Sequence, residues 1–544
     1  MNMKTRMLIG AGLLALASTS PAMAATRHKA RTAAAGTSQA EEIRQLKAQV
    51  QALAARIDAQ QAASQQATTL AAAASAKVEE VAQDTQATQA QVTAQASAMP
   101  DQVKMALASA PTPDKFYIKG LTITPGGFAD FSAIYRSHFQ GNDISTNFGA
   151  TPFPNNRPGQ VSEFRLTARH SRLSFLAEGA INANTKLSFY GEFDFLGAAQ
   201  TANSNESNSF NPRIRNLYGT IDWNKGDTGI HLLLGDSWSL VTMNSKGITP
   251  RNEIPPVVPE AQYVPGFTWA RQPQARITAD FLDHSLWMAV SLENPQTTFG
   301  GSVPPGVTFN APAGSGFDSV NTLSLNHIPD VVGKIAYEGK LGDHGLHMEA
   351  YGLYRNFTTH LNGIGNNNVS GGGFGGGFTA QIIPHVFDVQ FSGAIGTGLG
   401  RYGTSQLPDV TFDAAGNVHP LHETMLLAGA TLHATKALDI YGYAGEEYVD
   451  AKDFGVAGGV NYGYGNALAN NSGCLVEGGT CAGNSRKIAQ ITAGLWQKLY
   501  QGSWGRAQVG LQYSHTERTL FDAVGGGPTA KQDQGIISFR YYPF

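Results

Sequence analysis

Basic side chains recur on the polar positions of several short alternating segments of this chain. The set comprises Arg165, Arg169, Lys186, Arg213, Arg215 and Arg276. Arg213 and Arg215 illustrate the spacing, because residues two apart on a β-strand point the same way. A guanidinium stays charged and binds a carboxylate through two parallel hydrogen bonds. The set therefore predicts a site for small anions.

Acidic residues share the same faces and leave a second interpretation open. Glu192, Asp194 and Asp280 fall on polar positions of these segments. They could pair with the arginines and leave a transverse field with little net selectivity. Catalytic chemistry has no comparable support, since the sequence lacks a phosphate-binding glycine loop, zinc-type histidine spacing and a nucleophile elbow. We expect no enzyme activity, no metal and no cofactor.

Alternation with a period of two identifies the elements that position these side chains. In segment 186–195, Leu187 and Phe193 share an apolar face, whereas Glu192 and Asp194 share the polar one. The pattern predicts sixteen strands near 126–136, 163–178, 185–196, 212–224, 228–238, 271–282, 284–294, 329–340, 344–356, 373–383, 385–398, 422–434, 437–448, 486–498, 504–515 and 533–544.

The connections between these strands distinguish a sandwich from a membrane barrel. Every second connection is short, as in "INANT", "NKGDT" and "LGDHG", and the alternate ones are long, as at 137–162, 239–270, 295–328 and 449–485. Outer-membrane barrels have short periplasmic turns and long external loops, with an apolar face toward lipid and a polar face toward the lumen. We therefore expect an all-β transmembrane barrel of antiparallel strands at residues 116–544, with both ends of the barrel on the periplasmic side.

The long connection 239–270 contains five prolines, which restrict its backbone. Its charged residues are Lys246, Arg251, Glu253 and Glu260. Resemblance to general porins predicts that this loop folds inward and constricts the pore. The alternative is an external loop that contacts a neighbouring subunit.

The N-terminal region differs from the rest of the chain. Residues 1–24 have the charged, apolar and small-residue sections of a signal peptide, with an uncleaved membrane anchor as the alternative. After a flexible stretch at 25–40, residues 41–98 show apolar residues at heptad spacing, which favours a periplasmic coiled coil over a disordered Ala/Gln tract. Prolines mark a linker at 99–115.

Composition agrees with an exported β-rich protein. The chain has 62 glycines, 15% charged residues and a net charge of −3, which gives no indication of nucleic-acid binding. The two cysteines, Cys474 and Cys481, lie in a loop-like stretch. Outside the cytoplasm a local disulfide is favoured over a two-cysteine metal site.

The chain ends on the aromatic residue Phe544, within the last predicted strand. This strand must pair with the first one, because an open sheet edge cannot face lipid. A terminal Phe resembles the signal that the barrel-assembly machinery reads in outer-membrane proteins. A slip in the alternation is expected near Pro543.

The segments "RHSRLSFLAEG", "GEFDFLG", "RIRNLYGTID" and "LLLGDSWS", in this order, resemble the early strands of the DcaP-like outer-membrane porins. The resemblance implies a trimer of sixteen-stranded barrels that takes up small anionic solutes such as dicarboxylates. It also implies that Arg169 and Arg172 of "RHSR", and Arg213 and Arg215 of "RIR", stand at or near the constriction.

The sequence thus predicts an outer-membrane porin, surrounded by lipid, for passive diffusion of small polar, anionic solutes. The N-terminal segment would extend through the periplasm toward the peptidoglycan. The alternative function is a structural envelope tether, in which the barrel anchors the coiled coil.

Overall fold

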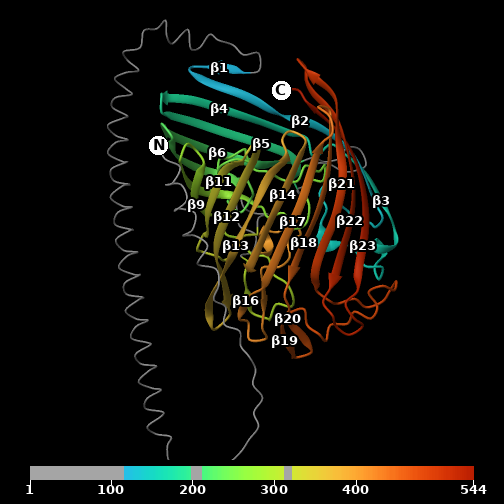
Figure 1. Cartoon of the computed structure of the whole chain (residues 1–544). Coiled ribbons are helices and arrows are strands. Elements are labelled where there is room, and N and C mark those ends of the chain that lie inside the picture. The colour runs from blue at the N-terminus through green and yellow to red at the C-terminus, as the bar shows by residue number, and fades with distance from the viewer. Residues whose placement is uncertain (1–114, 198–210, 311–321) are drawn as a thin grey trace, which may run out of the picture. The chain divides into compact units, whose positions relative to one another are not determined.

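The computed structural model describes residues 115–197, 211–310 and 322–544. In this part of the chain, sixteen antiparallel strands close into a barrel (Figure 1). This confirms the predicted fold class for the barrel. The signal peptide 1–24, the flexible stretch 25–40, the coiled coil 41–98 and nearly all of the linker 99–115 lie outside the described residues. Within the described ranges, no helix is long and apolar enough to cross a membrane.

The barrel strands follow one another around the wall, and each pairs with its neighbour along the chain. They are β2 (Leu121–Arg136), β3 (Glu163–Thr167) with β4 (Arg172–Asn182), β5 (Thr185–Gly197), β6 (Asn211–Lys225), β7 (Thr228–Trp238), β8 (Arg271–Phe281), β9 (Leu286–Glu293), β11 (Asp330–Leu341), β12 (His344–Leu361), β13 (Gly365–Ile383), β14 (Phe387–Thr397), β17 (His422–His433), β18 (Leu438–Val449), β21 (Ser485–Gly502), β22 (Gly505–Leu520) and β23 (Thr529–Tyr542).

Short elements complete the described chain. They are β1 (Phe116–Ile118), β10 (Val307–Thr308), β15 (Val410–Phe412), β16 (Val418–Pro420), β19 (Lys452–Ala457), β20 (Val460–Tyr464) and the 3-10 turns η1 (Phe148–Ala150), η2 (Arg157–Gln160) and η4 (Gly400–Tyr402). The sequence pattern did not predict the β1–β2 hairpin, whose turn places Lys119 and Gly120 at positive φ.

The second barrel strand is interrupted where the sequence predicted one continuous strand. Both β3 and β4 pair with β2, and residues 168–171 leave the ladder between them. Gly127 on β2 lies at the junction with φ +121, and a Cβ there would be 2.2 Å from the carbonyl oxygen of Arg172. Only glycine allows the backbones of β2 and β4 to approach this closely. The interruption therefore depends on a contact between these two strands, which the alternation within one strand does not reveal.

The last strand closes the barrel against the first, as predicted. β23 pairs with β2 from Ala129 opposite Tyr541 to Arg136 opposite Gln534. The chain does not end inside this strand, however. β23 ends at Tyr542, and Phe544 lies beyond it with an exposed side chain. Pro543 has no backbone N–H to donate, which explains why the ladder stops before it.

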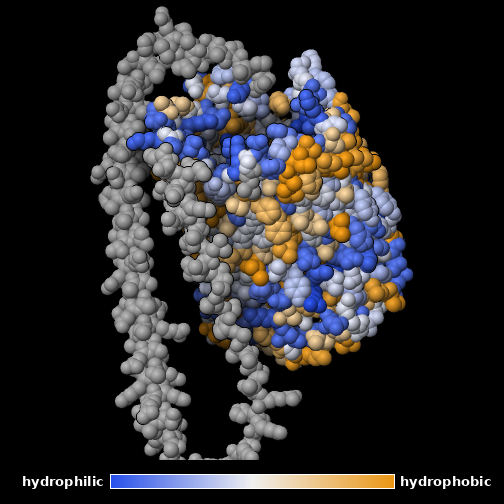
Figure 2. All heavy atoms as spheres, in the orientation of Figure 1, coloured by the Kyte–Doolittle hydropathy of each residue, from blue (hydrophilic) through white to orange (hydrophobic). Residues whose placement is uncertain are grey.

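Apolar and polar residues face opposite sides of the wall. On β5, Leu187 and Phe189 are exposed on the outside, whereas Asp194 is buried inside the barrel. Figure 2 shows apolar side chains gathered over the upper part of the visible outer face, with polar side chains above them and a mixed, more polar surface below. This distribution is the one expected of a barrel surrounded by lipid.

The two rims differ in the length of their connections, with one correction to the predicted pattern. The predicted long connection between β12 and β13 is instead a continuation of both strands to a tight turn at residues 362–364. Gly363 in this turn and Gly365 at the start of β13 adopt positive φ values. The ladder also gains β10, in which Val307 pairs with Leu361. At this point the long-loop rim therefore carries a hairpin in place of a long loop.

Candidate functional site: a loop inside the barrel facing an arginine wall

The connection 239–270, called the inner loop below, lies inside the barrel. Its backbone bonds to inward-facing side chains of many strands. The contacts are Lys334 Nζ to the Thr242 carbonyl at 2.7 Å, Gln390 Nε2 to the Ile254 carbonyl at 3.0 Å, Trp496 Nε1 to the Val257 carbonyl at 2.7 Å, and the Glu260 amide to Gln512 Oε1 at 3.0 Å. The loop thus crosses the interior toward β11, β14, β21 and β22.

Apolar packing fixes the second half of the inner loop. Val258, Tyr263, Val264 and Phe267 are buried in one cluster with inward-facing aromatic side chains of the wall. These wall residues include Trp238, Tyr441, Tyr443 and Trp496. Burial of such large side chains stabilises each by about 1.5–3 kcal/mol. The second half of the inner loop is therefore part of the folded core rather than an exposed surface loop.

The four charged residues of the inner loop have different positions. Lys246 is exposed and lines a cavity. Arg251 is exposed, donates to the Tyr218 hydroxyl at 3.2 Å and lies over the Tyr190 ring at 5.6 Å. Burial raises the pKa of Glu253, against the opposing effect of Arg276. The Oε1 atom of Glu253 is buried without a hydrogen-bond partner.

Glu260 is fully buried and holds the first long loop to the inner loop. It accepts hydrogen bonds from the Thr146 amide at 2.9 Å, the Thr146 hydroxyl at 2.7 Å and Gln534 Nε2 at 2.8 Å. Burial raises the pKa of its carboxyl group, and Arg136 acts in the opposite direction. Glu260, one of the four predicted constriction residues, thus joins the inner loop to the first long loop.

The arginines of β3 to β6 all have acidic partners. Arg165 pairs with Glu163 at 2.9 Å, and Arg169, in the interruption after β3, pairs with Asp143 at 3.2 Å. Arg172 pairs with Glu192 at 4.0 Å, and Arg213 pairs with Asp194 at 2.7 Å. In each of these pairs the guanidinium is the more exposed partner: 42% against 1% for Arg165 and Glu163, and 37% against 0% for Arg213 and Asp194.

We call this surface, made of Arg165, Arg169, Arg172 and Arg213, the arginine wall. Three of its members, Arg165, Arg169 and Arg213, line a cavity of about 650 Å³ near the long-loop rim. The first long loop contributes Asp143 and Thr146 to this cavity, and the inner loop contributes Gln262. The guanidinium groups of these three residues therefore face the cavity. Of their carboxylate partners, Asp143 lines the cavity as well, whereas Glu163 and Asp194 are buried.

Arg215 has a supporting role behind this surface. Its side chain is 1% exposed and bonds to Glu192 and to Asp194, the latter at 3.0 Å. A bulge in β6, where Glu192 pairs with Asn216 and Phe193 with Ile214, directs Arg215 inward. Arg215 thus neutralises the two carboxylates that also hold Arg172 and Arg213.

The remaining predicted residues lie away from the arginine wall. Arg276 on β8 is buried and donates to Gln274 Oε1 at 3.0 Å and to the Trp238 carbonyl. Asp280 bonds to His231 at 2.8 Å and to His284. Lys186 bonds to Glu178 near the short turn between β4 and β5. The structure does not bring these three residues together with the others.

Sequence reasoning missed Tyr263 of the inner loop and Arg271, the first residue of β8. Burial raises the pKa of the Tyr263 phenol, but Arg215, Arg172 and Arg271 outweigh this effect and lower it below the ordinary value. Three buried nitrogens here have no hydrogen-bond partner: Arg172 Nε, Arg215 Nη2 and Arg271 Nη1. No local pattern identifies this group, because its members meet only through the folded inner loop.

The two cysteines lie in the long connection between β20 and β21, and neither of them lines the cavity beside the arginine wall. Cys474 and Cys481 form a disulfide, and Cys474 packs with Phe153, Leu520 and Ala530. The Asn155 amide donates to the Cys474 carbonyl at 2.9 Å, which joins the disulfide loop to the first long loop. Among the described residues, no group of His, Cys, Asp and Glu could hold a metal ion.

Comparisons with known proteins agree with the architecture. No protein-family model matches the sequence, and no curated protein matches it. The structure of the outer-membrane channel DcaP of Acinetobacter baumannii superposes with a TM-score of 0.56 and 17% identity, covering 78% of this chain and 97% of that one.

Two further structures give weaker superpositions, each with a TM-score of 0.41. The anion-selective porin from Comamonas acidovorans is 15% identical and covers 78% of this chain and 99% of that one. OmpF of Salmonella typhi is 12% identical and covers 79% of this chain and 99% of that one. The DcaP superposition alone confirms the predicted resemblance to DcaP-like porins at the level of the fold: the chain has the fold of an outer-membrane channel.

Proposed function

We propose that this protein is an outer-membrane porin, a water-filled channel for passive diffusion of small polar solutes, and that it prefers anions. One observation carries the preference. Arg165 and Arg213 line the cavity with side chains that are 42% and 37% exposed, whereas their partners Glu163 and Asp194 are 1% and 0% exposed and do not line it. A solute therefore meets positive charge, although the wall is close to neutral overall.

The geometry also supports a carboxylate solute with two charges. Arg165, Arg169 and Arg213 line one cavity, so a dicarboxylate could contact two guanidinium groups at once. Passage requires weak binding, so we expect affinities of roughly millimolar. Association into a homotrimer, which the resemblance implies, is part of the same proposal and is checked by chemical cross-linking of the inserted protein.

The test is the reversal potential of single channels across a KCl gradient in a planar bilayer. We expect chloride preference, together with partial block by a small dicarboxylate. The variant Arg165→Gln/Arg213→Gln removes the two most exposed charges of the arginine wall and keeps Arg215. It should shift the reversal potential toward cations and weaken the block.

A matched control removes two positive charges from the outer face instead. Lys487 and Lys531 point away from the lumen and pair with Glu446 and Glu517. The Lys487→Gln/Lys531→Gln variant should keep the chloride preference. A cation-selective parent channel, or equal shifts in the two variants, would contradict the proposed role of the arginine wall.

A further inference from the structure

The first half of the inner loop is held against β11 and β12 by a chain of charged side chains. The Asn244 amide donates to Glu349 Oε2 at 3.0 Å, and the Gly247 amide donates to Glu338. Lys334 Nζ bonds to the Thr242 carbonyl at 2.7 Å and to Glu349 Oε1 at 2.7 Å. Two carboxylates and one ammonium group thus fix three backbone positions of the loop.

His347 on β12 joins the two carboxylates. Its Nδ1 lies 2.5 Å from Glu338 Oε1, and its Nε2 lies 3.0 Å from Glu349 Oε2. An ionised carboxylate can only accept hydrogen bonds, so both ring nitrogens must donate. Both contacts therefore exist together only when His347 is an imidazolium.

The charges of this group balance in that state. Lys334 and His347 carry two positive charges, and Glu338 and Glu349 carry two negative ones. Loss of the imidazolium proton breaks one of the two hydrogen bonds and leaves a negative charge uncompensated beside the buried Glu349. The Asn244 and Gly247 amides donate to these same two carboxylates. The contacts of the loop therefore weaken when His347 loses its proton.

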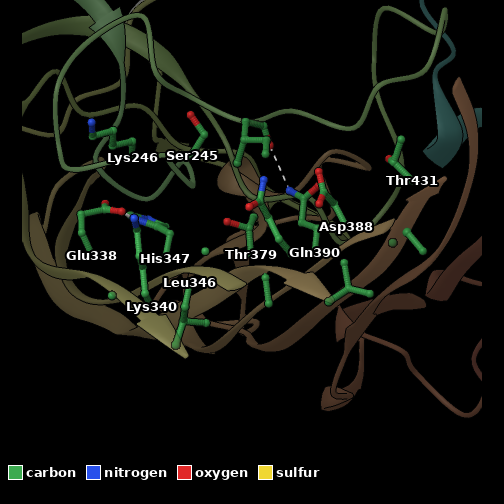
Figure 3. Close-up of a pocket in the computed structure, with 18 of the residues that line it drawn as sticks. Ser245, Lys246, Glu338, Lys340, Leu346, His347, Thr379, Asp388, Gln390 and Thr431 are labelled. Carbon is green, nitrogen blue, oxygen red and sulfur yellow. Dashed lines mark hydrogen bonds and ion pairs between the residues drawn. The ribbon is translucent and has the colours of Figure 1, made fainter. Parts of the chain in front are cut away.

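Water can reach this group from one side. Glu338 and His347 line a cavity of about 790 Å³ together with Ser245 and Lys246 of the inner loop (Figure 3). Figure 3 shows Lys340 beside His347, and Asp388 at some distance along the same cavity. A proton can therefore exchange between His347 and the lumen.

Other charged groups act on the same residues. Lys246 and Lys340 line the same cavity as His347, and the positive charge of each lysine disfavours the imidazolium form of His347. Arg276 on β8 and Glu253 of the inner loop carry opposite charges and both interact electrostatically with Lys334, so that their effects on its ammonium group oppose each other. Asp388 and His433, from β14 and β17, line the cavity and bond to each other at 3.2 Å. None of these groups replaces the bridge that His347 makes between Glu338 and Glu349.

We propose that His347 is the proton-dependent bridge of a latch, formed with Lys334, Glu338 and Glu349, that holds residues 242–247 of the inner loop against the barrel. The latch is closed at mildly acidic pH and opens as the pH rises through the titration of His347. Only its effect on conductance rests on the proposed porin function, because the position of the loop can be measured directly.

The experiment measures the accessibility of a buried loop position. Met243 is 2% exposed, and Ser503 is exposed in the short turn between β21 and β22. Since the two native cysteines are bonded to each other, Met243→Cys or Ser503→Cys supplies a single reactive thiol. The ratio of their modification rates by a thiosulfonate reagent removes the pH dependence that the two thiols share, and the histidine variants below separate the latch from the higher pKa of a buried thiol. We expect this ratio to rise about tenfold from about pH 6 to about pH 9.

Two histidine variants then locate the response. His347→Gln should give a high ratio at both pH values, because a neutral amide cannot bridge the two carboxylates as an imidazolium does. The control is His433→Gln, which removes a cavity-lining histidine with two carboxylate neighbours, Asp388 and Asp439, and no contact to the inner loop. It should keep the parent response. A ratio that does not change with pH in the parent barrel, or a response unchanged by His347→Gln, would overturn the latch.

Discussion

Arg213 and Asp194 form a two-point ion pair in which the cation is exposed and the anion is buried. Arg213 Nε lies 3.0 Å from Asp194 Oδ1, and Nη2 lies 2.7 Å from Oδ2. The same carboxylate also bonds to Arg215 from behind, at 3.0 Å. The two arginines of "RIR" therefore differ in exposure and in their contacts, although their spacing places them on the same face.

This difference predicts opposite outcomes for two single variants. Arg215→Ala leaves Glu192 and Asp194 without their shared buried partner, which costs about 3–5 kcal/mol of stability. Arg213→Ala leaves Asp194 paired with Arg215 and should retain the fold while it reduces chloride preference. Urea unfolding of the barrel in micelles measures the first effect, and reversal potentials measure the second. Equal stability of the two variants would contradict the supporting role of Arg215.

Tyr263 predicts a pH response of the selectivity. Its pKa is lowered by Arg215, Arg172 and Arg271 in spite of burial, so the phenol ionises below its unfolded value of about 10. As the pH rises through the folded pKa, a phenolate adds negative charge beside the arginine wall, and chloride preference should fall.

The sign for stability follows from the same shift. An acid with a lowered folded pKa contributes stability that is fully present above about pH 10 and is lost as the pH falls through the folded pKa. Tyr263→Phe should abolish both responses, which reversal potentials and urea unfolding against pH would show. If the variant keeps the response of selectivity, lysine titration rather than Tyr263 causes it.

Most of the barrel could be predicted because strand faces are a local property. Alternation in segments such as 186–195 gives the lipid and lumen faces without knowledge of the neighbours. The interruption between β3 and β4 could not be predicted in this way, since it depends on the approach of Gly127 to Arg172. The β12–β13 hairpin was missed because its Gly- and Asn-rich residues 362–373 have the composition of a loop.

The candidate site was predictable only in part for a related reason. Alternation places Arg165 and Arg213 on the inner face, but it does not say which partner covers them. Glu260 and Arg251 are both charged residues that directly follow a proline in the same loop, yet Glu260 is buried and Arg251 is exposed. The direction of a loop side chain depends on where the loop packs, and the inner loop packs against residues more than a hundred positions away, such as Tyr443.

The disulfide should stabilise the long-loop rim without affecting selectivity. Cys474 and Cys481 close a short loop, for which chain entropy gives about 2.5 kcal/mol at most. Neither cysteine lines the cavity beside the arginine wall. We expect the Cys474→Ser/Cys481→Ser variant to unfold at lower urea and to keep its reversal potential. Mass spectrometry after alkylation without reductant should find no modified cysteine in the parent, and two modified thiols would exclude the bond.

Deletion of residues 41–98 separates the porin from the tether function. Barrel closure needs only the pairing of β2 with β23, and the inner loop bonds to barrel strands within the part of the chain that the structure describes. The shortened protein should therefore insert and give the single-channel conductance and reversal potential of the parent. Cells that produce it should take up small anions at the parent rate, whereas a tether function predicts weakened attachment of the envelope. Loss of conductance from correctly inserted barrels would show that the N-terminal segment is part of the channel, and normal conductance with detached outer membrane would favour the tether.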